Sequence, residues 1–246
     1  MGYMRKRWWC RNGIQVVEYH TEKRHSPGEH RRKKENPTPE KKRQLNERRK
    51  AMEVQRLILN NFGEGDKYVT LTYHDAPDEK ECRRDIRHLM DWLRRKYART
   101  GAELKWIRNI ERTKRGVIHI HMLVNNPPGT DMGREIRKWW KERHGTIVKV
   151  SDTYLDGGFG RLARYLSKTQ RDEKGDIISS FSRSRNLAVP EPETKEFTRW
   201  NVRSRGEWRD IRVPKGFELV KESVYEGINQ VTGYPYRYYT MIRAGT

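Results

Sequence analysis

Two histidines, His119 and His121, flank one isoleucine in the segment VIHIHMLVN, which otherwise has the apolar pattern of a β-strand. Side chains alternate along a strand, so the two imidazoles share one face while Ile118, Ile120 and Met122 share the other. At about 3.3 Å per residue, the two histidines are roughly 7 Å apart along the strand. At that spacing two imidazoles can bind one metal ion. The alternative is a pair of structural histidines, hydrogen-bonded to neighbours or packed against a helix.

A third metal ligand follows from the expected register of a hairpin. A three-residue loop, Lys114-Arg115-Gly116, with the glycine in the left-handed conformation, places Glu111 directly across from His119. A loop of two or four residues would move Glu111 to the opposite face. Imidazole nitrogens suit manganese or zinc, and a carboxylate suits magnesium or manganese. The segment therefore predicts a divalent-metal site made of His119, His121 and Glu111.

A second candidate motif lies in GRLARYLSKTQ, which we expect to be helical. Arg161, Tyr165 and Lys168 are spaced four and three residues apart, so they lie along one helix face. A phenol with a pKa of about 10 is a weak nucleophile until a metal or a nearby cation stabilises its charge. Lys168 would either help to ionise Tyr165 or neutralise a phosphate that Tyr165 attacks. The alternative is a surface tyrosine between solvated basic residues. Tyr154 falls in an expected loop and is a weaker candidate.

The elements that would position these motifs alternate between helices and strands. Helices are expected at 39–62, from Asp78 to about Tyr97, at 131–144 and at 158–170, and strands at 67–74, 103–112, 117–125 and 146–150. A Tyr-rich pair of strands is expected within 217–243. This order predicts an α+β fold with a central antiparallel β-sheet flanked by helices.

The composition indicates a polyanionic partner. Lys and Arg number 54 against 33 Asp and Glu in 246 residues, and the formal net charge is +21. Eight Trp and twelve Tyr accompany these cations, which favours nucleic acid over a membrane surface. A basic structural protein is the alternative. No apolar run reaches the roughly 18 residues of a membrane span, so we expect a soluble protein that contacts no membrane.

Together these motifs resemble the HUH endonucleases, and among them the single-tyrosine rolling-circle replication initiators of small phages and plasmids. KYVTLTYHDAPD is similar to their first strand motif, IERTKRGVIHIHMLV to their metal motif, and YLSK to their nucleophile motif. SRSRNL resembles a recurrent feature of the phage branch. The resemblance covers about residues 65–190 and implies an endonuclease domain with the sheet of an HUH or RRM-like palm. It leaves 1–64 as a basic N-terminal extension with a long helix, and 191–246 as a Tyr-rich β segment packed on the same domain.

The resemblance implies site-specific nicking and joining of single-stranded DNA that starts rolling-circle replication. Mn²⁺ or Mg²⁺ on His119, His121 and Glu111 would polarise the scissile phosphate, and Tyr165, assisted by Lys168, would form a covalent 5′-phosphotyrosine. A conjugative relaxase or a single-strand transposase would use the same chemistry. A non-catalytic origin-binding protein is the alternative from another class.

The expected partners are an origin hairpin in single-stranded DNA and host replication proteins, in the cytoplasm of a bacterial cell. Trp139 and Trp140 are expected in the core, while Trp8, Trp9 and Trp200 are candidates for stacking on bases. The basic helix that begins at Pro39 either lies along nucleic acid or is a solvated charged face. Basic residues in or beside the motifs are the expected DNA contacts: Arg161, Arg164, Arg183, Arg185, Lys114 and Arg115.

Overall fold

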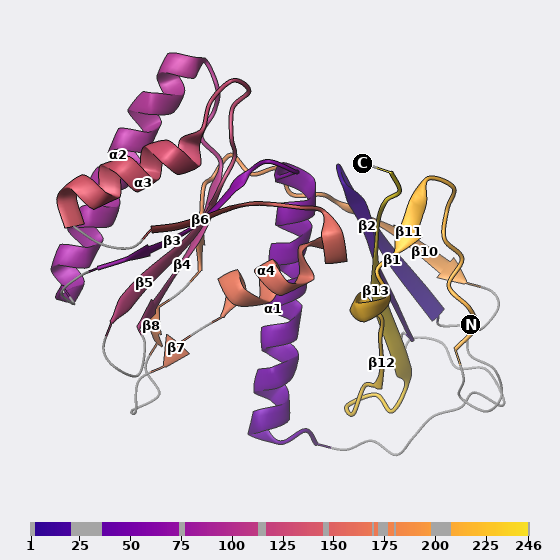
Figure 1. Cartoon of the computed structure of the whole chain (residues 1–246). Coiled ribbons are helices and arrows are strands. Elements are labelled where there is room, and N and C mark those ends of the chain that lie inside the picture. Colours follow the sequence, from indigo (N-terminus) through magenta and orange to yellow (C-terminus); the bar gives the residue numbers. More distant parts are fainter. Residues whose placement is uncertain are drawn as a thin grey trace. The chain divides into compact units, whose positions relative to one another are not determined.

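The computed structural model describes residues 3–20, 36–73, 77–112, 117–144, 148–168, 170–171, 177–179, 181–197 and 208–245. The chain forms two compact units (Figure 1). The central unit comprises residues 61–154 and 162–188. The terminal unit comprises residues 1–60, 155–161 and 189–246. None of the helices in the described ranges is long and apolar enough to cross a membrane.

The central unit is built on a five-stranded sheet in the order β6-β3-β5-β4-β9. All of its neighbouring strands are antiparallel. Two further short strands, β7 and β8, pair with each other. The predicted α+β class with antiparallel sheets is therefore confirmed. The strands have these bounds: β3 Lys67–Thr72, β4 Trp106–Arg112, β5 Ile118–Val124, β6 Val148–Asp152, β7 Gln170–Arg171, β8 Ile177–Ser179 and β9 Ser182–Arg183.

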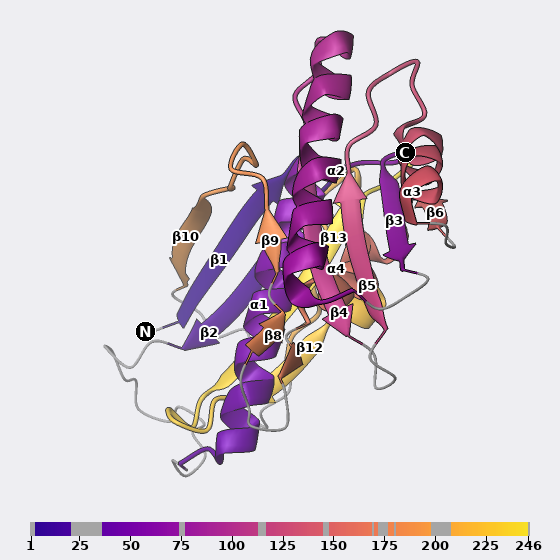
Figure 2. The same cartoon turned by 90° about the vertical axis from the view of Figure 1, so that its left-hand side faces the viewer.

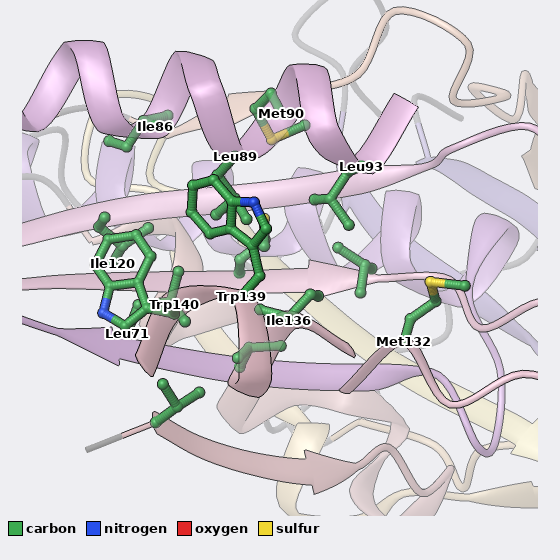
Figure 3. Packing of buried hydrophobic residues seen from close by; sticks show 14 of the residues in the cluster. Leu71, Ile86, Leu89, Met90, Leu93, Ile120, Met132, Ile136, Trp139 and Trp140 are labelled. Carbon is green, nitrogen blue, oxygen red and sulfur yellow. The ribbon is translucent and has the colours of Figure 1, made fainter. Parts of the chain in front are cut away.

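Two helices, α2 (Glu79–Thr100) and α3 (Met132–His144), cover one face of this sheet. A capping box of Asp78 and Glu81 begins α2, and Gly101 ends it in the left-handed conformation. The aliphatic face of β5 packs under both helices, as its alternation predicts. Figure 3 shows the packing of this core, in which Trp139 and Trp140 are buried as expected. The histidine face of β5 therefore lies on the other side of the sheet.

The terminal unit joins both ends of the chain in a six-stranded sheet in the order β10-β1-β2-β13-β11, with β12 paired to β13. Figure 2 shows the long hairpin of β1 and β2 with β10 at its edge. The bounds are β1 Tyr3–Cys10, β2 Gly13–His20, β10 Pro192–Phe197, β11 Phe217–Leu219, β12 Tyr225–Ile228 and β13 Pro235–Arg243. The unit also contains helix α1 and two short 3-10 helices, η1 (Asp156–Phe159) and η2 (Lys221–Ser223).

The N-terminal strands and the C-terminal strands, expected in separate segments of the chain, pair with each other. Tyr3 pairs with Phe197, and Tyr19 pairs with Tyr236, so the two ends of the chain form one sheet. Backbone N–H and C=O groups of a buried strand need partners, and here each terminal segment supplies partners for the other. Buried Glu18 further joins the ends, because it accepts hydrogen bonds from Arg5 on β1 and Arg237 on β13.

Helix α1 (Pro39–Asn61) begins where the sequence predicts, with Thr38 accepting a hydrogen bond from the Lys41 amide at 3.3 Å. Ala51, Val54 and Ile58 share one apolar face of this helix and are buried. Most of the side chains in its N-terminal half are exposed. The first half of the helix therefore presents its charges to solvent, while the second half packs in the core.

Candidate active site

Strand β5 lies between β3 and β4, and the register aligns polar side chains of all three strands on the face away from α2 and α3. Thr72, His119 and Glu111 form one row across the sheet. Thr70, His121 and Asn109 form the next row. Glu111 thus lies opposite His119, as the hairpin argument predicts. The loop residues on which that argument depends, 113–116, lie outside the described residues.

Hydroxyl groups from β3 orient both imidazoles. Nδ1 of His119 lies 2.9 Å from the Thr72 hydroxyl. Nδ1 of His121 lies 3.1 Å from the Tyr68 hydroxyl and 3.2 Å from the Thr70 hydroxyl. A hydroxyl oxygen can accept a hydrogen bond from Nδ1–H, and this tautomer leaves the Nε2 lone pair for a metal. The β3 hydroxyls are therefore placed like the hydrogen-bond partners that orient metal-binding histidines in other proteins.

Tyr165 brings its hydroxyl to these side chains from helix α4 (Gly160–Ser167). The phenol donates a hydrogen bond to Glu111 Oε2 at 3.0 Å, and its oxygen lies 3.2 Å from His121 Nε2. The Tyr165 ring stands edge-on to the His121 ring, with centroids 4.6 Å apart. His121 is only 4% exposed, whereas Tyr165 is 41% exposed. The phenolic oxygen is therefore next to the predicted metal ligands and still accessible to a substrate.

Lys168 lies just beyond α4, and its Nζ is 2.5 Å from Glu111 Oε1. The expectation that the helix continues to Gln170 is wrong, because α4 ends at Ser167 and the chain enters β7 at Gln170. Buried Asn109 fixes this end, since its amide donates to the Lys168 carbonyl at 2.8 Å and to the Tyr165 carbonyl at 3.4 Å. Tyr165 and Lys168 therefore still reach the same carboxylate.

Burial and charge set the protonation of the three central groups. Burial lowers the pKa of His121 to about 4, although the neighbouring Glu111 carboxylate acts in the opposite direction. Burial raises the pKa of Tyr165 to about 12, and the hydrogen bond to Glu111 adds to this rise. Burial also acts to raise the pKa of Glu111, but hydrogen bonds from Lys168 and Tyr165 outweigh it and lower that pKa. At neutral pH the site holds a neutral imidazole, a carboxylate and a protonated phenol.

This donor set has the chemistry of a divalent-metal site. Neutral imidazole and carboxylate are ligands for Mn²⁺, and the carboxylate also suits Mg²⁺. His121 Nε2 and Glu111 Oε2 are 3.5 Å apart, a separation that two ligands of one ion can have, and the two imidazole centroids are 6.0 Å apart. Across the described ranges no three His, Cys, Asp or Glu groups already converge tightly enough to hold a metal. In this arrangement Glu111 instead binds Lys168 and Tyr165.

Four of the six expected DNA-contacting residues lie within the described ranges, and all four are exposed. Arg161 and Arg164 are exposed on α4, Arg183 is exposed on β9, and Arg185 is exposed in the turn that follows. Lys114, Arg115 and Trp200 lie outside the described residues. Of the other stacking candidates, Trp9 is exposed, whereas Trp8 is buried with the Arg56 guanidinium 4.0 Å from its ring centroid. Trp8 is therefore a poor stacking surface. Tyr154 is exposed.

Four residues of the site were not identified from the sequence: Tyr68, Thr70, Thr72 and Asn109. The first three alternate with Val69 and Leu71 in the segment KYVTLT, so the signal was present there. Aligning that strand with β5 would have placed its hydroxyls beside the histidines. Asn109 is two residues before Glu111 and shares its face, but its contacts depend on where α4 ends.

Residues 66–170 match the family model described as replication-associated protein ORF2/G2P. This segment contains both histidines, Glu111, Tyr165 and Lys168, together with the hydroxyl residues of β3 and Asn109. No curated protein and no solved structure matches the chain. The family match supports a role in replication initiation, and the matched part of the chain is the part that forms the candidate site.

Proposed function

We propose that the protein nicks and rejoins single-stranded DNA at a specific site, through a covalent 5′-phosphotyrosine at Tyr165, and thereby initiates rolling-circle replication. The observation that carries this proposal is the position of the Tyr165 hydroxyl, 3.0 Å from Glu111 and 3.2 Å from His121. A solvent-accessible phenol beside two imidazoles and a carboxylate is suited to covalent phosphoryl transfer. The family match supports the replication role of this chemistry.

In the cleavage step, the Tyr165 oxygen attacks phosphorus and the bond from phosphorus to the 3′ oxygen of the preceding nucleotide breaks. The 5′ phosphate stays on the tyrosine, and the leaving 3′ oxygen takes up a proton to become a 3′ hydroxyl that a polymerase can extend. The phenol proton must leave as the new bond forms, and in the structure that O–H points at Glu111 Oε2. Attack by the 3′ hydroxyl on the phosphotyrosine reverses these changes, so joining requires no nucleotide triphosphate.

A divalent cation, Mn²⁺ or Mg²⁺, bound by His119, His121 and Glu111 would polarise the scissile phosphate and lower the cost of charge on the phenolic oxygen. The chain's own residues then have separate tasks. Thr72, Tyr68 and Thr70 hold the imidazoles in place. Lys168 supplies positive charge for the phosphate oxygens. Exposed Arg164 and Arg183 are available for contacts to the DNA backbone.

Two other settings share this chemistry, a conjugative relaxase and a single-strand transposase. The match to a replication-associated family favours replication initiation over both. We expect the DNA partner to be an origin hairpin, in the cytoplasm of a bacterial cell, with host replication proteins acting on the released 3′ end. A non-catalytic origin-binding protein is the alternative from a different class, and it needs no nucleophile.

Denaturing gels distinguish a nicking enzyme from a non-catalytic origin-binding protein. The protein is incubated with randomised single-stranded oligonucleotides and Mn²⁺, and a protein–DNA band that survives denaturation reports the covalent intermediate. We expect Tyr165→Phe to abolish this band while non-covalent binding persists. Tyr154→Phe is the matched control, because Tyr154 is an exposed tyrosine outside the cluster. A band of undiminished intensity in Tyr165→Phe, or mapping of the DNA to another tyrosine, would show the assignment to be wrong.

A further inference from the structure

We propose that the terminal unit carries a stacking surface for single-stranded DNA, formed by four tyrosines on its sheet beside helix α1. We call Tyr19, Tyr225, Tyr236 and Tyr238 the tyrosine patch. All four lie outside the segment that matches the replication family. The inference rests on the proposed function for the identity of the substrate, but the surface itself is defined by geometry in another part of the fold.

Strand pairing places the four side chains on one face of the sheet. Tyr19 pairs with Tyr236, and Tyr225 pairs with Tyr238, across antiparallel neighbours. Tyr236 and Tyr238 are two residues apart on β13, so they point the same way. Figure 1 shows β12 beside β13 in the terminal unit. All four side chains are partly exposed, which distinguishes them from the buried aromatic Tyr239 on the opposite face.

Three of the four rings contact one another, with Tyr225 between Tyr236 and Tyr238. The Tyr225 and Tyr238 rings are stacked with centroids 5.1 Å apart, and the Tyr225 and Tyr236 centroids are 5.8 Å apart. Gly227 lies opposite Tyr236 and makes room for this arrangement. A Cβ at Gly227 would be 3.0 Å from the Tyr225 ring and 3.2 Å from the Tyr236 ring. The strand thus has a glycine where a larger side chain would push these two rings apart.

Cations lie directly on the patch. The Arg48 guanidinium carbon is 3.6 Å from the Tyr225 ring centroid and 6.0 Å from that of Tyr238. Lys6 Nζ lies 5.9 Å from the Tyr19 ring centroid. Arg48 belongs to the exposed half of α1, whose residues 39–50 include six basic and two acidic side chains. Positive charge therefore borders the aromatic surface along the helix.

This combination fits single-stranded DNA better than duplex DNA. Aromatic faces bind unstacked bases with little regard to sequence, while adjacent Lys and Arg follow the backbone phosphates. In a duplex the base faces are already stacked, so tyrosine rings would add little and only the basic helix would contribute. The excess of positive charge at this surface complements a polyanion. The tyrosine patch therefore predicts binding that depends on rings as well as on charge.

Fluorescence anisotropy with a labelled single-stranded oligonucleotide tests this inference. The full chain carries Tyr165→Phe throughout, so that no covalent product contributes to the signal. We expect Tyr225→Leu and Tyr238→Leu each to weaken binding about tenfold, because stacking on one base is lost. Tyr225→Phe and Tyr238→Phe retain the ring and should keep the affinity. Tyr154→Leu, at an exposed tyrosine of the central unit, is the matched control.

Three results would overturn the inference. One is unchanged affinity in both leucine variants, with the fold verified by circular dichroism. Another is equal loss in the leucine and phenylalanine variants. The third is a combination of two observations. Duplex and single strand bind equally tightly, and the affinity for both falls in Arg48→Gln but not in Tyr225→Leu. If a leucine variant does not fold, the comparison of single-stranded with duplex DNA in the Tyr165→Phe chain still decides, because the stacking surface predicts clearly tighter binding of the single strand.

The outcome is separable from that of the proposed function. An unsubstituted chain that forms no tyrosine–DNA adduct would refute the nicking chemistry. The anisotropy measurement would be unaffected, because it follows non-covalent binding in the Tyr165→Phe chain. Conversely, an adduct at Tyr165 in a protein whose leucine variants bind normally would leave the chemistry standing and remove the stacking surface.

Discussion

The hydroxyl of Tyr165 lies 3.2 Å from Nε2 of His121, so the proposed nucleophile and a proposed metal ligand are already neighbours. Because burial and Glu111 raise the pKa of Tyr165 to about 12, the phenol is protonated at neutral pH and needs a cation to become a nucleophile. We therefore expect chelation of divalent metal to slow formation of the tyrosine–DNA adduct at least about a hundredfold, and added Mn²⁺ to restore it.

The control for this first prediction is binding of the same oligonucleotide, measured by anisotropy with and without chelator. Phosphate contacts from Lys and Arg need no metal, so we expect binding to change little. His119→Ala and His121→Ala should each reduce Mn²⁺ affinity in calorimetric titrations. Adduct formation at the full rate in the presence of chelator would rule out the metal site assigned to these two residues.

Thr72 should tune metal affinity without touching the metal. Its hydroxyl lies 2.9 Å from Nδ1 of His119 and holds that ring in place. Thr72→Val preserves the shape of the side chain but removes the hydroxyl, so we expect Mn²⁺ affinity to fall about 10- to 100-fold. Thr72→Ser keeps the hydroxyl and is the matched control. Calorimetric titration of both variants with Mn²⁺ measures the difference, and equal affinities would show that the hydroxyl does not orient a ligand.

Local sequence patterns predicted three features of the central unit. The capping box at Asp78 and Glu81 fixed the start of α2, and the period-two pattern of IHIHM separated the apolar core face from the histidine face. The pairing of Glu111 with His119 required only a hairpin register. Each of these features depends on residues close together in the chain, so the local sequence is enough to predict its geometry.

The Tyr-rich strands within 217–243 were expected, but their assembly with the N-terminal strands into one sheet was not predicted, because these pairings are remote in sequence. Tyr3 pairs with Phe197 and Tyr19 with Tyr236, and neither pairing leaves a signal in the neighbouring residues. The charged run Arg5-Lys6-Arg7 also obscured β1, since its cations look like those of an irregular basic segment. A local signal for β1 and β2 was Asn12-Gly13 at the turn between them, a dipeptide that favours tight hairpins.

Lys168 should compete with metal for Glu111. Its Nζ is 2.5 Å from Glu111 Oε1, but its side chain is 53% exposed, so the ion pair contributes at most about 1 kcal/mol. We expect Lys168→Met to raise Mn²⁺ affinity by up to about fivefold. The rate of adduct formation should nevertheless fall about a hundredfold, because positive charge for the phosphate oxygens is lost.

The two effects of Lys168→Met are measured separately, by calorimetric titration with Mn²⁺ and by adduct formation at saturating Mn²⁺. Lys80→Met is the control, since Lys80 is exposed on α2, the helix that packs on the other face of the sheet. A loss of activity that extra Mn²⁺ restores would place Lys168 in metal binding instead of phosphate stabilisation.

Asn109 should act as a positioning residue for the nucleophile. It is 2% exposed, and its amide donates to the carbonyls of Lys168 and Tyr165 where α4 ends. We expect Asn109→Ala to lower the free energy of unfolding by about 1–3 kcal/mol, because the part-buried Lys168 carbonyl loses the Asn109 donor. With the end of α4 released, Tyr165 should also react more slowly at temperatures where the variant is fully folded, while the oligonucleotide Kd stays unchanged.

Asn186→Ala is the matched control for Asn109, because Asn186 also donates its amide to a backbone carbonyl, that of Leu104, but is exposed. Chemical denaturation gives the stability of both variants, and single-turnover adduct formation gives the rate. A purely structural role for Asn109 predicts lower stability with an unchanged single-turnover rate. A slower rate with an unchanged Kd instead means that the amide holds Tyr165 at the reacting distance from the histidine face, and that the end of α4 is part of the site's geometry.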